Sequence, residues 1–301
     1  MGYGGYSYDS ASTRACYYSA KASIDPTYLD NEVFNRSFSG EMNIKGKIRE
    51  SRDSEEHPNS FPIAIFLDVT GSMGDIPRQL ITSGFPELMK KIMDAGVEHA
   101  QVCFGAVGDH EWDSAPIQVG QFETSDELQE KWLSSVYIEE GGGSNYGESY
   151  ALPWYVAARH MITDSNEKRS KKGVLITVGD EPYLKTIPKK VIEQLFGSAQ
   201  ADVTAAEAFA EASKNWDIYH INVKDYSGKR EEVQKAWKQL LSNHFVNTQT
   251  NDGSDVPDII ANIVIDSYKK NADKDELLTD SVQSAETETG EKEEEPRKHL
   301  L

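Results

Sequence analysis

The sequence predicts a Rossmann-like α/β protein with a doubly wound, mostly parallel sheet, one antiparallel edge strand and helices on both faces. Three observations predict this class. Strand and helix patterns alternate through residues 61–270. Ile63–Leu67 is uniformly apolar and rich in β-branched residues, which is typical of a strand buried on both faces of a parallel sheet. Gln118–Phe122 follows the strand expected at Ala100–Val107 too closely for a crossover helix, so it should pair antiparallel.

The remaining elements follow from apolar spacing and capping residues. Two further buried strands are expected at Val174–Val178 and Ile218–Val223. Helices are expected wherever apolar residues recur at a spacing of three or four. The first expected helix covers 80–93, where Pro86 should kink or split it. Capping residues predict two more, one that begins with a Thr124–Glu127 capping box and one that begins with Thr204 and Glu207. The others are expected from about Gly147 to Met161, over 233–241 and over 256–264.

Composition divides the chain into three zones. Residues 1–60 are rich in Tyr, Ser, Gly and charge, and weak alternation over Ser37–Ile48 suggests an extension that lays a strand on the main body. Residues 61–270 form the expected α/β domain. Residues 271–301 carry ten acidic and four basic side chains and cannot bury apolar area, so we expect a disordered acidic tail.

Charge and hydropathy exclude several functions. The chain has 31 Lys and Arg against 50 Asp and Glu, for a net charge of −19, which disfavours nucleic-acid binding. No apolar run is long enough to span a membrane, and the N-terminus has no secretory signal pattern. The two cysteines lack the spacing of a zinc or redox motif. We therefore expect a cytoplasmic protein without membrane or nucleic-acid partners.

The loop after the first buried strand reads Asp68-Val69-Thr70-Gly71-Ser72-Met73. A carboxylate and two hydroxyls at alternate positions can direct three oxygens at one point, and such hard ligands suit Mg²⁺ or Mn²⁺. In doubly wound sheets, ligands bind beyond the carboxyl ends of the strands, where this loop should lie. Asp68, Thr70 and Ser72 are therefore candidate metal ligands; the alternative is that they only cap the following helix.

These residues resemble the von Willebrand factor type A (vWA) domain, whose metal-ion-dependent adhesion site opens with D-x-[ST]-G-S-M after its first strand. Gly142-Gly143-Ser144-Asn145-Tyr146-Gly147 is similar to the second metal loop of that family, with Ser144 as the implied ligand. The third family element is an Asp in T-D-G. Here Thr177-Val178-Gly179-Asp180 displaces the carboxylate by two positions, so Asp180 would bind directly, through a water, or not at all.

Further polar residues should lie near the same edge. The loop after the second strand contains Asp109, His110, Glu111 and Asp113, which would add carboxylates behind the metal, a second cation, a partner-recognition surface, or only a solvated acidic hairpin turn. Glu148 is expected at the start of a helix, whose positive dipole end favours a carboxylate. Alternatively, Glu148 only begins a helix at the protein surface. Asn145, a neighbour of Ser144, is a further candidate residue near the metal.

The favoured function is a binding module rather than an enzyme. With few anionic ligands, the cation keeps an open position for an Asp or Glu of a partner protein, as the vWA resemblance also implies. Small intracellular vWA proteins of bacteria and phages suggest an AAA+ ATPase as the partner class. One alternative is a Mg²⁺-dependent phosphoryl-transfer hydrolase, although Thr70 replaces the second Asp of its D-x-D-x-T pattern. The other is a structural vWA protein with a degenerate metal site.

Overall fold

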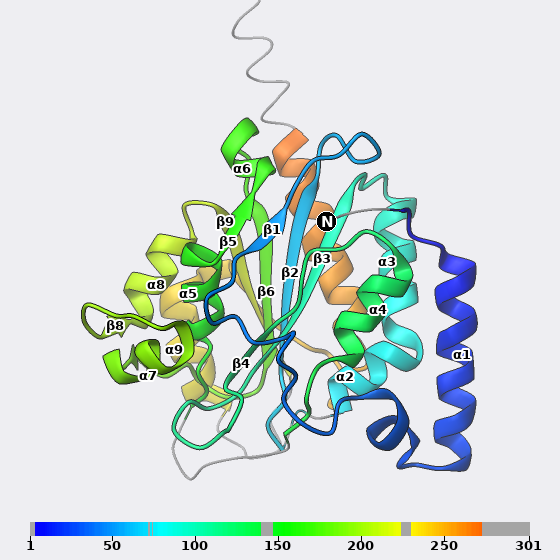
Figure 1. The fold of residues 1–301 in the computed structure, drawn as a ribbon, viewed down its shortest axis with the longest axis horizontal. Coiled ribbons are helices and arrows are strands. Elements are labelled where there is room, and N and C mark those ends of the chain that lie inside the picture. Colours follow the sequence, from blue (N-terminus) through cyan, green and yellow to red (C-terminus); the bar gives the residue numbers. More distant parts are fainter. Residues whose placement is uncertain (1–3, 72, 74, 140–146, 224–229, 273–301) are drawn as a thin grey trace, which may run out of the picture.

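The central sheet of the computed structural model has the strand order β10-β9-β6-β2-β3-β4 (Figure 1). The structure describes residues 4–71, 73, 75–139, 147–223 and 230–272. All neighbours in this sheet are parallel except β3 and β4, which confirms the doubly wound class and the antiparallel strand. The strands are β2 (Phe61–Asp68), β3 (Ala100–Val107), β4 (Ile117–Val119), β6 (Gly173–Gly179), β9 (Trp216–Asn222) and β10 (Phe245–Asn247).

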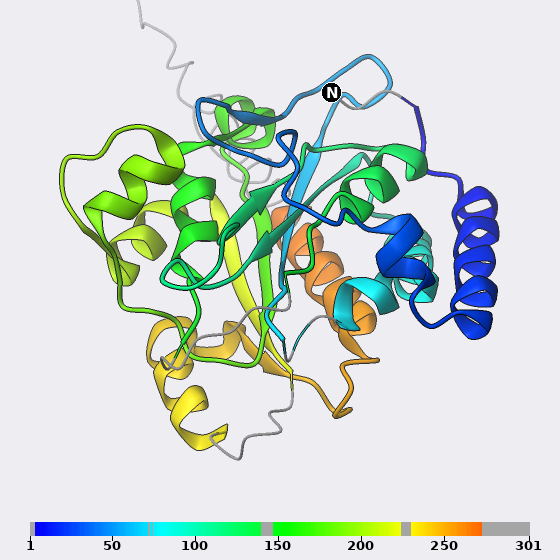
Figure 2. The same ribbon diagram turned by 60° about the horizontal axis from the view of Figure 1, so that its bottom comes forward.

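Alternate side chains of each strand enter two apolar layers, because successive residues of a strand point to opposite faces. Ile63, Ile65 and Leu67 of β2 lie in one layer, whereas Ala64 and Phe66 lie in the other. Helices cover both layers, as Figure 2 shows from an oblique angle. The first layer is covered by α2 (Asp75–Gln79), α3 (Phe85–Asp94), α4 (Asp126–Ser134) and the helix at 256–272; the second is covered by α5 (Ala151–Arg159), α7 (Lys189–Phe196), α8 (Ala205–Ala212) and α9 (Arg230–Leu241).

The helices confirm some local expectations and correct others. A π-helical turn at Leu80–Gly84 separates α2 from α3, and Pro86 lies in the first turn of α3, so the long helix is split as expected. The Thr204–Glu207 capping box is present. The Thr124–Glu127 box was wrong: Ser125 caps α4 by accepting from Leu128 N, and the Thr124 hydroxyl donates to the Gly4 carbonyl. α5 is shorter than expected and ends before Met161, which begins another strand.

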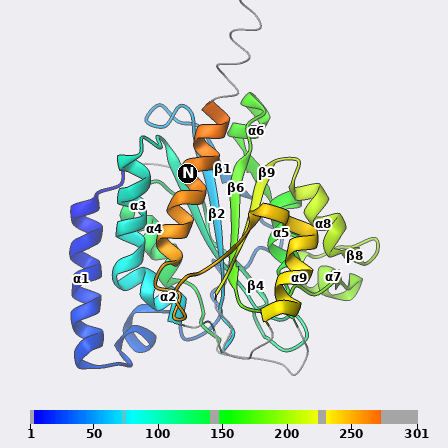
Figure 3. The ribbon, with the colours of Figure 1, turned by 180° about the vertical axis from the view of Figure 1, so that it is seen from behind.

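The first sixty residues contain a helix that the sequence did not predict. α1 (Tyr8–Ile24) lies outside α3 and α4, where Arg14 pairs with Asp126 and Glu130 (Figure 3). The strand expected over 37–48 is wrong. A shorter one, β1 (Arg49–Ser51), pairs instead with β5 (Met161–Thr163), outside the central sheet.

The C-terminal end of the described chain is relevant to the acidic tail predicted at 271–301. The last helix continues to residue 272 and so includes the first two residues of the tail predicted at 271–301, while residues 273–301 lie outside the described residues. The limits assigned to the three zones remain predictions. None of the described helices has both the length and the apolar character that a membrane span requires.

Candidate functional site

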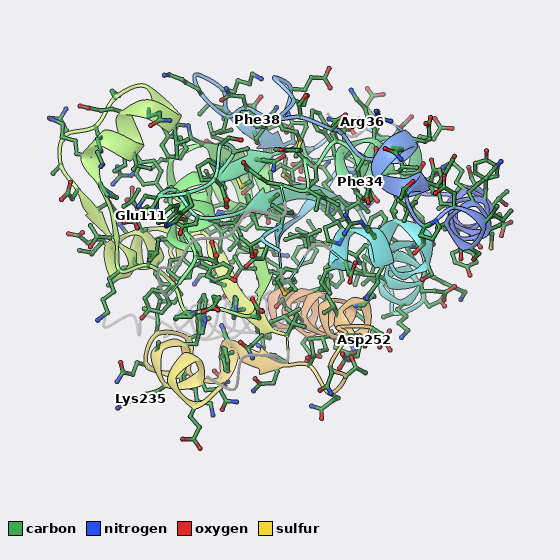
Figure 4. The ribbon with its side chains drawn as sticks, turned by 90° about the horizontal axis from the view of Figure 1, so that it is seen from below. Phe34, Arg36, Phe38, Glu111, Lys235 and Asp252 are labelled. Atoms are coloured by element: carbon green, nitrogen blue, oxygen red, sulfur yellow. The ribbon has the colours of Figure 1, made fainter. Side chains whose placement is uncertain are left out.

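The central strand β2 brings three loops together at the carboxyl edge of the sheet. The chain passes from β2 to β3 on one side and later to β6 on the other, so β2 is the point at which the strand order reverses. Asp68 ends β2 opposite Val107 of β3, while Leu67 pairs with Val178 of β6. Figure 4 views the molecule from this edge and labels Glu111 on the loop after β3. Doubly wound folds place their ligand crevices at such a reversal.

Asp68 is fully buried, and both oxygens of its carboxylate are hydrogen-bonded. Oδ1 accepts from the Thr70 backbone nitrogen at 2.9 Å and from the Thr70 hydroxyl at 2.6 Å. Oδ2 accepts from the Tyr150 hydroxyl at 2.5 Å. Gly179 leaves room for this last contact, since a Cβ there would lie 1.8 Å from the Tyr150 oxygen. None of these partners is a cation, so the donors that the described residues supply to this carboxylate are neutral.

The segment at 148–149 joins the loops after β3 and β6. The Glu148 nitrogen donates to the Pro182 carbonyl at 2.8 Å, and the Ser149 nitrogen donates to the Gly108 carbonyl at 3.2 Å. Glu148 therefore precedes the helix α5, which begins at Ala151, and the helix-start position predicted for it was wrong. Burial between two loops, rather than a helix dipole, determines the environment of its carboxyl group.

Burial and like charge raise the pKa values of the carboxyl groups at this edge. Burial, reinforced by the negative charge of Asp180, raises the pKa of Asp68 to about 7. Burial, followed by the charges of Asp68 and Asp109, raises the pKa of Glu148 to about 10. Burial and the Asp68 charge also raise the pKa of Tyr150 well above its ordinary value. The described side chains thus supply these acids with repulsion but not with a counter-charge.

Within the described part of the chain, Oδ2 of Asp109 and Oε2 of Glu148 are buried carboxylate oxygens without a hydrogen-bond partner. Asp109 is fully buried, and Glu148 is only 6% exposed. Buried polar atoms are rarely left in this condition, and each such group calls for an explanation such as an ion or a catalytic role.

The structure places most of the predicted site residues at this edge. Asp68, Asp180 and Glu148 are close enough for their charges to interact. His110 is half-buried, with its backbone nitrogen donating to the Ser149 hydroxyl at 2.9 Å. Glu111 is exposed, and Asp113 is half-buried. Ser72, Ser144 and Asn145 lie outside the described residues. Tyr150, Ser149 and Gly179 were missed, because no local pattern marks a contact between residues so far apart in sequence.

Comparison with solved structures identifies the fold. No protein-family model and no curated protein matches the sequence. The open conformation of the pilus adhesin SpaC from Lactobacillus rhamnosus GG gives a TM-score of 0.50 at 10% identity, covering 75% of this chain and 31% of that one. A von Willebrand factor type A protein from Catenulispora acidiphila gives 0.43 at 15% identity, covering 70% and 43%. The chain has a vWA-like fold.

The match is limited in extent. This chain corresponds to less than half the length of each of those two proteins. An aerotolerance-related membrane protein from Bacteroides fragilis NCTC 9343 is covered over 99% of its length, with 69% of this chain, at a TM-score of 0.38 and 14% identity. At such low identities the likeness concerns the fold alone.

The donors at the edge of this vWA-like fold fit a hydroxyl-rich cation site better than a carboxylate cage. Among the described residues, no three Asp, Glu, His or Cys side chains are grouped so that they could hold a metal ion by themselves. Asp68 and Thr70 are nevertheless adjacent, and carboxylate and hydroxyl oxygens are hard ligands suited to Mg²⁺ or Mn²⁺. The unpartnered oxygens of Asp109 and Glu148 are consistent with a cation nearby.

Proposed function

We propose that the chain is a protein-binding module that captures an acidic side chain of a partner through a divalent cation at the carboxyl edge of the sheet. The observation that carries the proposal is Asp68, a fully buried carboxylate at the strand-order reversal whose hydrogen-bond donors among the described residues are all neutral. A buried charge without a counter-charge is costly, and a bound cation removes that cost.

Asp68, Thr70, Ser72 and Ser144 would hold Mg²⁺ or Mn²⁺, with Asp180 as a further ligand. The cation would act as a Lewis acid that accepts a carboxylate oxygen at an open position. Tyr150 orients the Asp68 carboxylate through its 2.5 Å hydrogen bond, while Glu148 is close enough for the charges of Asp68 and Asp109 to act on it. The residues on the loop after β3, His110, Glu111 and Asp113, face the partner. We propose a cytoplasmic setting and an AAA+ ATPase as the partner class, by analogy with other vWA proteins.

Calorimetric titration of the full chain with Mg²⁺ and Mn²⁺ tests the metal site. We expect binding of one ion and its loss in Asp68→Ala, because that substitution removes the carboxylate from the set Asp68, Thr70 and Ser72. Glu127→Ala, on the solvent side of α4, is the matched control and should bind as the wild type does. No binding by the native protein, or equal binding by Asp68→Ala, would favour a structural protein with a degenerate site.

Hydrolysis of a generic phosphate ester in Mg²⁺ tests the enzyme alternative. In the structure, the hydroxyl of Thr70, which stands where a phosphatase of this pattern has its second Asp, donates to Asp68. We therefore expect no turnover above background. Turnover by the wild type that disappears in Asp68→Ala would show that the protein is a hydrolase rather than a binding module.

A further inference from the structure

The loop after β3 has an unusual combination of backbone order and side-chain exposure. Trp112 is 58% exposed, whereas the other four tryptophans are at most 8% exposed. Burial of the large apolar surface of tryptophan is favourable, so a solvent-exposed indole is a recurrent feature of binding surfaces. Its place in the chain is informative: the loop begins directly after Val107, the residue of β3 that pairs with Asp68.

Each backbone N–H from Gly108 to Ala115 donates a hydrogen bond. Asp109 organises the centre: its carbonyl accepts from the nitrogens of Trp112 at 3.2 Å and Asp113 at 2.8 Å, and its Oδ1 accepts from Glu111 N at 2.8 Å. Asp113 Oδ2 accepts from Asp109 N at 2.7 Å. The remaining four bonds run to atoms outside this turn: Gly108 N to Pro116 O, His110 N to Ser149 Oγ, Ser114 N to Glu139 Oε1 and Ala115 N to Glu139 Oε2.

Gly108 is required for this arrangement. A Cβ at that position would lie 2.2 Å from Asp113 Oδ2, which is the atom that accepts from Asp109 N. The loop is therefore fixed before any partner arrives, and binding does not have to order it. Preorganisation of this kind improves affinity because the entropy of ordering is already lost in the free protein.

We infer that Trp112 is the apolar anchor of the partner-binding surface, and that the partner is a protein segment with an Asp or Glu next to an apolar pocket or side-chain cluster. The inference rests on the proposed function, since the acidic residue would occupy the cation while the indole of Trp112 enters the neighbouring apolar contact. Exposed Glu111 beside Trp112 adds a preference for a basic residue at the rim of that contact.

Random short peptides displayed on phage, panned on the full chain in Mg²⁺, provide the probe. We expect the enriched peptides to combine an acidic residue with adjacent aliphatic or aromatic residues. Trp112→Ala should weaken their binding about tenfold to a hundredfold, as truncation of a central aromatic anchor does. The matched control is Ile24→Ala, because Ile24 is 84% exposed but lies at the end of α1. It should bind like the wild type.

Fluorine NMR of the protein labelled with 5-fluorotryptophan gives a second readout. Substitution of Trp112 by Phe assigns its resonance among the five. The enriched peptide should shift this resonance and leave those of the buried tryptophans in place. Gly108→Ala retains the indole of Trp112 but displaces Asp113. It should therefore broaden the Trp112 resonance and weaken peptide binding, although Trp112 itself is not substituted.

The outcomes separate this inference from the proposed function. If Asp68→Ala or a chelator abolishes peptide binding while Trp112→Ala binds normally, metal-dependent capture is supported and the anchoring role of Trp112 is contradicted. If Trp112→Ala weakens binding but Asp68→Ala and chelator do not, the anchor stands and metal-dependent capture is wrong. Panning that enriches no peptide, or peptides that ignore both substitutions, contradicts the inference.

Discussion

Carboxylates that are shielded from water have opposite surroundings at the two ends of the central sheet. At the amino edge, Asp53 accepts from the guanidinium of Arg169 at 2.7 and 3.1 Å and from the Ser60 nitrogen and hydroxyl. Burial opposes its charged form, but the hydrogen bonds from Arg169 and Ser60 outweigh burial and hold the pKa of Asp53 below its usual range. At the carboxyl edge, burial and neighbouring acids raise the pKa of Asp68 instead.

A second pair supports the same contrast. Asp164 is buried at the amino edge, where it pairs with Arg52 at 2.8 Å and with Lys168 at 2.7 Å. Glu148 is similarly buried at the carboxyl edge, and the charges that act on its carboxyl group are those of other acids. The chain thus supplies counter-charges where carboxylates hold the structure together. Where the described residues offer no counter-charge, a cation from solution is the simplest compensation.

The largest effect should come from breaking the compensated pair. Arg169→Ala removes the guanidinium that donates to both oxygens of Asp53 and a hydrogen bond to the Ser60 carbonyl, and it leaves the 13% exposed Asp53 side chain with Lys168 at 3.3 Å as its cation. We expect a loss of about 3 kcal/mol in the free energy of unfolding, measured in urea at neutral pH. Lys45→Ala, at an exposed lysine, is the control and should change little. A loss below about 1 kcal/mol would mean that the amino edge does not depend on this pair.

Packing around Asp68 gives the next effect. Gly179→Ala should destabilise the protein by about 2 kcal/mol, because its Cβ would meet the Tyr150 hydroxyl and would lie 2.9 Å from Asp68 Oδ2. Tyr150→Phe removes the hydroxyl, so the double variant should lose less stability than the two single losses combined. Strict additivity in a urea-unfolding cycle would show that these side chains do not share one space.

The sign of the third effect separates the two edges. Without metal at pH 8, Asp68→Asn should stabilise the protein by about 1 kcal/mol, because a buried carboxylate with a raised pKa is penalised when it is ionised. The asparagine oxygen can still accept from Thr70. Asp53→Asn should instead destabilise the protein, since the charged form of Asp53 is the one that the fold stabilises. Equal losses in both variants would remove the distinction between the edges.

The smallest effect is a change in acid sensitivity. The pKa of Asp53 is lower in the folded chain than in the unfolded chain, so the unfolded state takes up the proton first and stability falls as the pH drops below about 4. Arg169→Ala should flatten this fall by less than about 1 kcal/mol for each pH unit. Unfolding curves collected from pH 5 to pH 2 measure it, and an unchanged slope would assign the acid sensitivity to other groups.

The fold was predictable where the pattern is local and strong. Ile63–Leu67 has no polar residue, and such a run has few alternatives to a buried strand. α1 escaped prediction because its buried residues include only small alanines, Ala11 and Ala15, and its attachment depends on the ion pairs of Arg14 with α4. β10 escaped because three residues carry too little periodicity to be recognised.

The candidate site was predictable in its position but not in its contacts. The end of a buried strand followed by Asp68 and Thr70 points to the carboxyl edge of the sheet. The hydrogen bond from Tyr150 to Asp68 joins residues 82 positions apart, and sequence patterns do not encode such tertiary pairs. Glu148 also shows this limit, because the folded loops around it, rather than the following helix, determine its burial and its pKa.

Urea unfolding at pH 7.5 across a range of Mg²⁺ concentrations tests the central claim most directly. If the carboxyl edge holds a cation, the free energy of unfolding of the wild type should rise with Mg²⁺ as RT ln(1 + [L]/Kd), about 1.4 kcal/mol for each tenfold increase above Kd. The Asp68→Asn variant should show no such rise, while Asp53→Asn, destabilised at the other edge, should keep it. A wild-type stability that does not respond to Mg²⁺, or an equal response in Asp68→Asn, would contradict the account.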